Sequence, residues 1–208
     1  MKRFQNLVLV VMVVGIAVQT WMAVSRTHSR SRDRSNLPKP LLVGDTLRAL
    51  SGYSAPGDPS VISLDSDGAS ATVMYIFDPD CVHSVSLGSL WARHFDRVWE
   101  EDVGVRRIAV SLASPLSARK FAERHGWRLE VLSMAGLSSE RKEYSLASKT
   151  PWVFVFDSDG VLRLHDHGSE LDEVQAAVAQ LLSESAAVMS GSLPSTTRWP
   201  FPIPLESE

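Results

Sequence analysis

The chain has 208 residues, of which 44% are hydrophobic and 22% are charged, a composition that excludes an intrinsically disordered protein. Its net charge of −3 at pH 7 provides no basic face for nucleic acid, so we expect no nucleic-acid partner. The only cysteine is Cys81, which excludes an intramolecular disulfide framework and a cysteine-rich zinc site.

The N-terminal residues 1–25 contain an apolar run from Leu7 to Val24, preceded by Lys2 and Arg3. As a helix, this run would span about 27 Å at roughly 1.5 Å per residue, close to the thickness of a bilayer's hydrocarbon core. A cleaved signal peptide would have a shorter run and a small-x-small cleavage site, which residues 19–25 lack. We therefore predict an uncleaved, single-pass membrane anchor, with a cleaved signal peptide as the alternative.

Two sequence features give opposite orientations for this anchor. More Lys and Arg residues follow the run than precede it, and this count alone would leave the domain in the cytoplasm. The short N-terminal tail ahead of the run is instead the layout of a signal anchor with an exported domain. We predict an extracytoplasmic, periplasmic domain, tethered by the polar, Arg- and Ser-rich linker at residues 26–40.

Residues 41–183 are predicted to form one folded domain in which strands and helices alternate. Strands are expected where apolar and β-branched residues run together between turn residues. They cover Val61 to Leu64, Ala71 to Phe77, Val105 to Leu112, Trp127 to Val131, Trp152 to Phe156 and Val161 to Leu164. The last two flank the Asp-Ser-Asp-Gly turn at residues 157–160, which predicts a hairpin.

Helices are predicted between these strands and after them. The first begins near Cys81, because apolar residues then recur at steps of three and four. They are Leu87, Leu90, Trp91, Phe95, Val98 and Trp99. The second lies between Ser114-Pro115 and Gly126, which are start and stop signals. Its predicted inner face consists of Leu116, Phe121 and Ala122. The third runs from Leu171 to Leu182. This order predicts an α/β domain whose mixed sheet is covered by helices on both faces.

Residues 184–208 differ from the domain in composition, being rich in Ser, Gly and Pro. Near the end, Pro200, Pro202 and Pro204 stand at alternate positions and disfavour both helix and sheet. We expect an extended tail. It is either disordered or packed on its own domain, or it is a docking peptide for a partner.

Cys81 is the candidate reactive group, because it stands where a strand ends and a helix begins. Unpaired N–H groups and the dipole at a helix N-terminus favour thiolate over thiol. A His83 imidazolium would favour the thiolate further, and Ser84 could donate a hydrogen bond to the sulfur or cap the helix. An inert, buried cysteine is the alternative.

Two aspartates next to this cysteine oppose its ionisation. Asp78 and Asp80 are close to Cys81 in the sequence, and each carries a carboxylate. A like charge ~4 Å away costs the thiolate about 1 kcal/mol in water. We therefore expect Cys81 to be only partly activated.

Four segments, in this order, resemble the thioredoxin fold and its membrane-anchored, extracytoplasmic thiol-disulfide oxidoreductase branch. They are residues 43–45, residues 77–81, Thr150-Pro151 and residues 156–160. The resemblance covers about residues 41–183. It implies a thioredoxin-like domain with a cis bond before Pro151, which faces Cys81 across a shallow groove. It also implies that Thr150, Pro151 and Trp152 bind the substrate.

The sequence departs from this family at the second cysteine of its working motif, where Ser84 stands. Cys81 keeps the attacking sulfur, but Ser84 cannot resolve a mixed disulfide by internal attack. We therefore predict a monothiol disulfide oxidoreductase or reductant relay that acts on protein thiols or disulfides without a cofactor, with Cys81, His83 and Ser84 as its catalytic residues. The alternative is a redox-inactive module that holds a partner peptide or a maturation protein.

Two further functions are less well supported by the residues present. A peroxidase of the peroxiredoxin type would have Thr or Ser three residues before the cysteine, where this chain has Asp78. Metal delivery through Cys81 and a histidine would need more ligands. His165 and His167 alternate on one predicted strand but lack a third ligand, so we predict no metal site.

Overall fold

The computed structural model describes residues 39–54, 57–65, 68–98, 104–138 and 141–190. The predicted anchor, nearly all of the predicted linker and the proline-rich end of the tail lie outside these ranges. Within the ranges, no helix combines the length and the apolar character that a bilayer-spanning segment needs.

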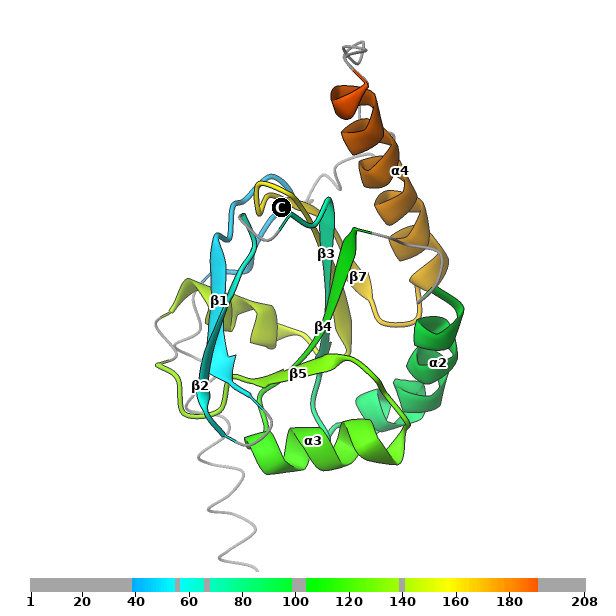
Figure 1. Cartoon of the computed structure of the whole chain (residues 1–208). Coiled ribbons are helices and arrows are strands. Elements are labelled where there is room, and N and C mark those ends of the chain that lie inside the picture. Colours follow the sequence, from blue (N-terminus) through cyan, green and yellow to red (C-terminus); the bar gives the residue numbers. More distant parts are fainter. Residues whose placement is uncertain (1–38, 55–56, 66–67, 99–103, 139–140, 191–208) are drawn as a thin grey trace, which may run out of the picture.

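Seven strands form one mixed sheet in the order β2-β1-β5-β4-β3-β6-β7 (Figure 1). Their bounds are β1 (Ala49–Tyr53), β2 (Pro59–Ser63), β3 (Ala71–Phe77), β4 (Val105–Ser111), β5 (Glu130–Ser133), β6 (Trp152–Asp157) and β7 (Leu162–His167). β3, β4 and β5 are parallel neighbours, whereas β1–β2, β1–β5, β3–β6 and β6–β7 are antiparallel pairs. The predicted mixed sheet is confirmed.

The described helices are α2 (Val82–Val98), α3 (Pro115–Arg124), α4 (Leu171–Met189) and the 3-10 helix η1 (Lys142–Ser148). Two hydrophobic clusters fill the two faces of the sheet, since Val73 and Tyr75 of β3 belong to one cluster and Met74 and Ile76 to the other. The first cluster contains the buried side chains of α2, α3 and α4. The second contains those of residues 41–47, β1, β2 and η1.

Helices therefore cover both faces, but unequally. In Figure 1, α2 and α4 lie to the right of the central strands β3 and β4, and the strands β1 and β2 lie to the left of them. The three described α-helices share one face, and only the short η1 lies on the other. The reason is the strand order. Because β3, β4 and β5 follow one another across the sheet, two right-handed crossovers in the same direction bring α2 and α3 to the same side.

Several predicted bounds differ from the structure. Leu116 of α3 is 60% exposed rather than buried, because the buried stripe runs through Ala118, Phe121 and Ala122. The strand expected at residues 127–131 begins only at Glu130. Trp127 instead closes the turn after α3, where its backbone N–H donates to the carbonyl of Ala122 at 2.9 Å.

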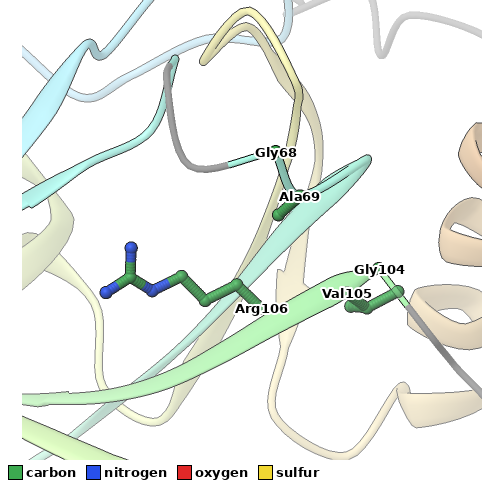
Figure 2. Close-up of a pocket in the computed structure, with 5 residues that line it drawn as sticks. All are labelled: Gly68, Ala69, Gly104, Val105 and Arg106. Carbon is green, nitrogen blue, oxygen red and sulfur yellow. The ribbon is translucent and has the colours of Figure 1, made fainter.

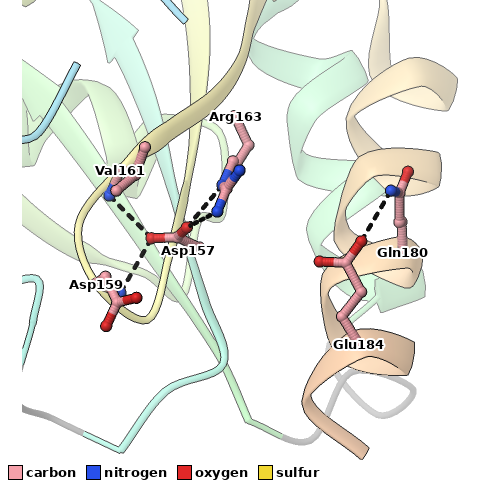
Figure 3. Close-up of polar contacts among 6 residues, drawn as sticks. All are labelled: Asp157, Asp159, Val161, Arg163, Gln180 and Glu184. Atoms are coloured by element: carbon pink, nitrogen blue, oxygen red, sulfur yellow. Dashed lines mark hydrogen bonds and ion pairs between the residues drawn. The ribbon is translucent and has the colours of Figure 1, made fainter. Parts of the chain in front are cut away.

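The C-terminal helix is longer than predicted. α4 continues past Leu182 to Met189, so the first residues of the predicted tail are helical. Its fully buried side chains end at Leu181, and the later turns extend away from the sheet (Figure 1). Gln180 donates to Glu184 at 2.9 Å along this segment (Figure 3).

β1 is absent from the sequence-based prediction because it contains Ser51 and Gly52, which have little strand propensity. Gly52 lies so close to β5 that an added Cβ would stand 2.6 Å from both Leu132 Cγ and the Ser133 carbonyl oxygen. Tertiary contact therefore determines this strand, and only glycine fits there.

The predicted β6–β7 hairpin is present and is held by the carboxylate of Asp157 (Figure 3). One oxygen accepts the N–H groups of Asp159 at 3.0 Å and Val161 at 2.9 Å. The other accepts from the Arg163 guanidinium at 2.6 Å. The Asp157 side chain is only 8% exposed, so its loss would leave these donors without a compensating acceptor.

We expect Asp157→Ala to destabilise the domain by about 1–3 kcal/mol, because it removes a nearly buried carboxylate that accepts two backbone N–H groups and pairs with the partly exposed Arg163. Urea unfolding measures this loss. The matched control is Glu123→Ala, which removes the exposed Arg119–Glu123 pair on α3 and should cost less than about 0.5 kcal/mol. Equal losses in the two variants would contradict the role assigned to Asp157.

Candidate functional site

Cys81 lies in the turn between β3 and α2, at the position predicted for it. Its N–H donates to the Asp78 carbonyl at 2.9 Å, and its own carbonyl accepts the N–H of Val85 at 3.0 Å. Cys81 is thus the residue from which the first hydrogen bond of α2 starts, and its side chain is half-buried at the helix N-terminus.

Ser84 is the best-buried polar residue of this turn, with 2% of its surface exposed. Its hydroxyl oxygen accepts the N–H of Asp78 at 3.1 Å, which ties the end of β3 to the first turn of α2. The Ser84 side chain also lowers the pKa of the Cys81 thiol. Ser84 therefore both orders the turn and contacts the reactive atom.

The pKa of the Cys81 thiol lies below its ordinary value. Burial raises this pKa, but four hydrogen bonds to the sulfur together lower it by more. They come from the backbone N–H groups of Ser84 and His83 and from the side chains of Ser84 and Thr150. The turn thus favours the thiolate, the form that acts as a nucleophile.

Two expectations about this pKa need correction. The carboxylates of Asp78 and Asp80 are not among the causes of the shift. Asp78 instead uses its carboxylate to accept the N–H of Asp80 at 2.9 Å. The contribution of His83 is its backbone N–H, whereas its imidazole is not a cause of the shift and the residue is exposed.

Thr150 is brought to Cys81 from 69 residues further along the chain, with its carbonyl oxygen 4.0 Å from the sulfur. The Thr150–Pro151 bond is cis, as the resemblance implies, and Pro151 is buried. The thiol thus faces the loop that precedes β6.

Trp152, which was predicted to bind the substrate, contacts side chains of β7 and Lys149. Its indole N–H donates to His165 Nδ1 at 3.3 Å, and the Lys149 ammonium lies 4.5 Å from its ring centroid. His167 contacts the same ring, with centroids 5.8 Å apart. Burial and the Lys149 charge lower the pKa of His165. Lys149 was not predicted, because nothing in the sequence indicates a cation–π contact.

The first turn of α2 also exposes two apolar side chains that were not predicted. Val82 is 72% exposed and Val85 is 43% exposed, next to Cys81 in the chain. Both lie outside the buried stripe of the helix. The predicted periodicity of Leu87, Trp91 and Phe95 could have revealed that these two valines are exposed.

A hollow of about 520 Å³ lies away from this site, at the starts of β3 and β4 (Figure 2). It is lined by Gly68, Ala69, Gly104, Val105 and Arg106. Its only charged side chain, Arg106, pairs with Glu130 at 3.2 Å. Among the residues that the structure describes, no group of three or more His, Cys, Asp or Glu side chains is arranged to hold a metal ion.

Comparison with solved structures identifies the fold. A peroxiredoxin-like protein from Aquifex aeolicus matches with a TM-score of 0.55 and 18% identity, over 70% of this chain and 90% of that one. The C-terminal domain of a Bacteroides thetaiotaomicron protein that carries the name of a thiol-disulfide oxidoreductase matches with a TM-score of 0.53 and 18% identity, over 67% and 97%. A Chlorobium tepidum protein that carries the name of the thiol:disulfide interchange protein DsbE matches with a TM-score of 0.50 and 18% identity, over 66% and 99%.

The chain has a thioredoxin-like fold. No protein-family model and no curated protein matches the sequence significantly. At 18% identity the solved structures establish this fold alone, so the activity of the thioredoxin-like domain must be argued from the site.

We expect Ser84→Ala to raise the pKa of Cys81, because the variant loses the hydroxyl that donates to the thiolate. A hydrogen bond of this kind contributes about 1 kcal/mol, so the alkylation rate at neutral pH should fall about fivefold. The pH dependence of iodoacetamide alkylation measures the change. The matched control is Ser86→Ala in the same helix, whose hydroxyl donates to the His83 carbonyl at 2.8 Å. If both variants react alike, the Ser84 hydroxyl does not stabilise the thiolate.

Proposed function

We propose that this thioredoxin-like protein is a monothiol disulfide oxidoreductase or reductant relay that acts through Cys81 on protein thiols or disulfides. The observation that carries the proposal is the position of the Cys81 thiol, which stands directly before α2 and 4.0 Å from the Thr150 carbonyl oxygen of the facing loop. Its pKa is lowered by hydrogen bonds from both sides of the site, Ser84 and His83 on α2 and Thr150 on the facing loop. An inert structural cysteine would be buried in apolar surroundings, which raise the pKa.

The proposed reaction consists of three thiol–disulfide exchanges. The Cys81 thiolate attacks one sulfur of a substrate disulfide, the S–S bond breaks, and the other sulfur leaves as a thiolate. A mixed disulfide between Cys81 and the substrate remains. A Ser84 hydroxyl cannot attack this bond, so a thiolate from a small thiol or a reduced protein must do so. This exchange leaves the first external thiol in a new disulfide with one of the two sulfurs. A second external thiol breaks that disulfide, so the two electrons that reduce the substrate come from two external thiols, which end joined to each other.

We expect the wild-type protein to accumulate mixed disulfides with protein partners on non-reducing gels. Ser84→Cys should restore internal resolution, shorten the life of these species and raise turnover in an insulin reduction assay by at least about tenfold, since an intramolecular thiol has a far higher effective concentration than an external one. Ser86→Cys is the matched control, because it places a second thiol in the same helix but on the exposed side. Equal turnover of both variants would count against the mechanism.

A second candidate function is a binding module that does not use the thiol. The observation that favours it is the exposed apolar pair Val82 and Val85 beside the site. Cys81→Ala separates the two functions, because it removes the sulfur and keeps this surface. Loss of partner capture in Cys81→Ala supports the oxidoreductase. Retained partner binding and cellular function would replace it with the binding module.

We also propose that residues 7–24 anchor the protein in a membrane and that the domain is extracytoplasmic. The length of the apolar run and the resemblance to the membrane-anchored branch support this. Reporter fusions after Lys39 provide the test. A reporter that is active only after export should be active, and a reporter that needs the cytoplasm should be silent. The opposite pattern would show that the excess of Lys and Arg after the run sets the orientation.

A further inference from the structure

The end of α3 is held against α2 by two aromatic residues that meet at Gly88. A Cβ at Gly88 would lie 2.5 Å from both Cε1 and Nε2 of His125, so the imidazole edge occupies the space where a side chain would stand. Beside it, the Trp127 indole N–H donates to the Gly88 carbonyl at 3.0 Å. The Phe121 ring supports the imidazole, with centroids 4.6 Å apart. We call His125, Trp127 and Gly88 the α2–α3 contact.

Protonation of the His125 nitrogen that points at α2 would be energetically unfavourable. His125 Nε2 is buried and has no hydrogen-bond partner in the described part of the chain. The neutral ring therefore carries its proton on Nδ1, and protonation would add an N–H that faces the Gly88 backbone without an acceptor. Burial lowers the pKa of His125, and the Arg124 charge lowers it further. Its other neighbours at the contact, Gly88, Phe121 and Trp127, carry no charge.

The α2–α3 contact acts on the same helix that activates Cys81. Gly88 lies less than two turns after the start of α2 at Val82. The N–H groups of His83 and Ser84, which lower the pKa of Cys81, belong to the first of these turns. A displacement of Gly88 would therefore also move the N–H groups of His83 and Ser84 relative to the Cys81 sulfur, because they belong to the same short helical segment.

We propose that the α2–α3 contact is an acid-sensitive positioning device for Cys81. When His125 becomes charged, its ring must leave Gly88 for solvent, and the first turns of α2 lose this contact with the end of α3. Cys81 then becomes less reactive than its own ionisation alone would make it. The proposed function is needed only to explain why the cell would use such a device. The device itself changes the reactivity of the thiol and does not require disulfide exchange.

The direction of the pH effect follows from the direction in which the pKa of His125 is shifted. The pKa of His125 is lower in the folded protein than the ordinary value of 6.5. Above pH 6.5 the ring is neutral in both folded and unfolded chains, and the contact is intact. As the pH falls below 6.5, the unfolded chain binds the proton first, so the contact loses stability until the pH has passed the lower pKa of the folded state.

The test is the rate of Cys81 alkylation by iodoacetamide between pH 4.5 and pH 8 on the whole chain. We expect the wild-type rate to fall below a single-ionisation curve on the acid side of 6.5, by at least about threefold. His125→Asn, which cannot titrate and is smaller than the imidazole, should follow a single ionisation. His167→Asn on β7 is the matched control and should keep the wild-type profile. A single-ionisation profile in the wild type, or an additional step that persists in His125→Asn, would overturn the proposal.

A second measurement starts from the wild-type protein. In the wild-type protein, the Trp127 indole N–H and the amides of His83 and Ser84 should shift in NMR spectra with the same midpoint as the His125 ring, below 6.5. Gly88→Ala should displace the ring and move that midpoint up towards 6.5. Amides that do not follow His125 would exclude coupling to Cys81. A failed insulin assay would leave both measurements valid, so the device and the proposed function can fail separately.

Discussion

The hydrogen-bonded hydroxyl of Ser84 is the interaction on which the site depends. It accepts the N–H of Asp78, which fixes the exit of β3, and the Ser84 side chain lowers the pKa of the Cys81 thiol. A cysteine at this position could resolve a mixed disulfide, but its thiol is a weaker donor and acceptor than a hydroxyl. The chain therefore lacks an internal resolving thiol, while its remaining thiolate is held by a stronger hydrogen bond.

The register of the central strands explains why residues far apart in sequence meet at this sulfur. β3 and β6 are antiparallel, with Ile76 opposite Trp152. The residues that follow β3 must then lie beside those that precede β6, which brings Cys81 to Thr150. β3 is buried along its whole length between two partner strands, so it cannot slip relative to either of them without moving apolar side chains to the wrong face. The geometry of the site follows from this fixed register.

Sequence alone was sufficient where one periodicity dominates a segment. β3 and the buried stripe of α2 were predicted from an unbroken apolar run and from steps of three and four residues. β1 was missed because Ser51 and Gly52 form a strand only through contact with β2 and β5. Its pairing is set by neighbours far along the chain, which no local propensity encodes.

The same limit applies to the candidate site. The positions of Cys81, Ser84 and the Thr150–Pro151 bond could be predicted from motif order. The directions in which individual side chains and backbone N–H groups point could not be predicted. Asp78 is close to Cys81 in sequence, yet its carboxylate accepts a backbone N–H of its own turn. His83 contributes through an N–H that every non-proline residue has. Side-chain direction depends on the folded turn, so charge proximity in sequence was a poor guide to electrostatics.

The groups that activate Cys81 also affect how a mixed disulfide would be broken under the proposed mechanism. A thiol of lowered pKa is the better leaving group, so an external thiolate that attacks the partner's sulfur expels Cys81 easily. Attack on the Cys81 sulfur itself is hindered, because that atom is half-buried against Thr150 and the first turn of α2. The partner would then leave joined to the external thiol and be reduced only in a second exchange. A cysteine at position 84 would attack the Cys81 sulfur from within the helix and release the partner already reduced. Under the proposed mechanism, a serine rather than a cysteine at position 84 therefore changes the first product of resolution as well as its rate.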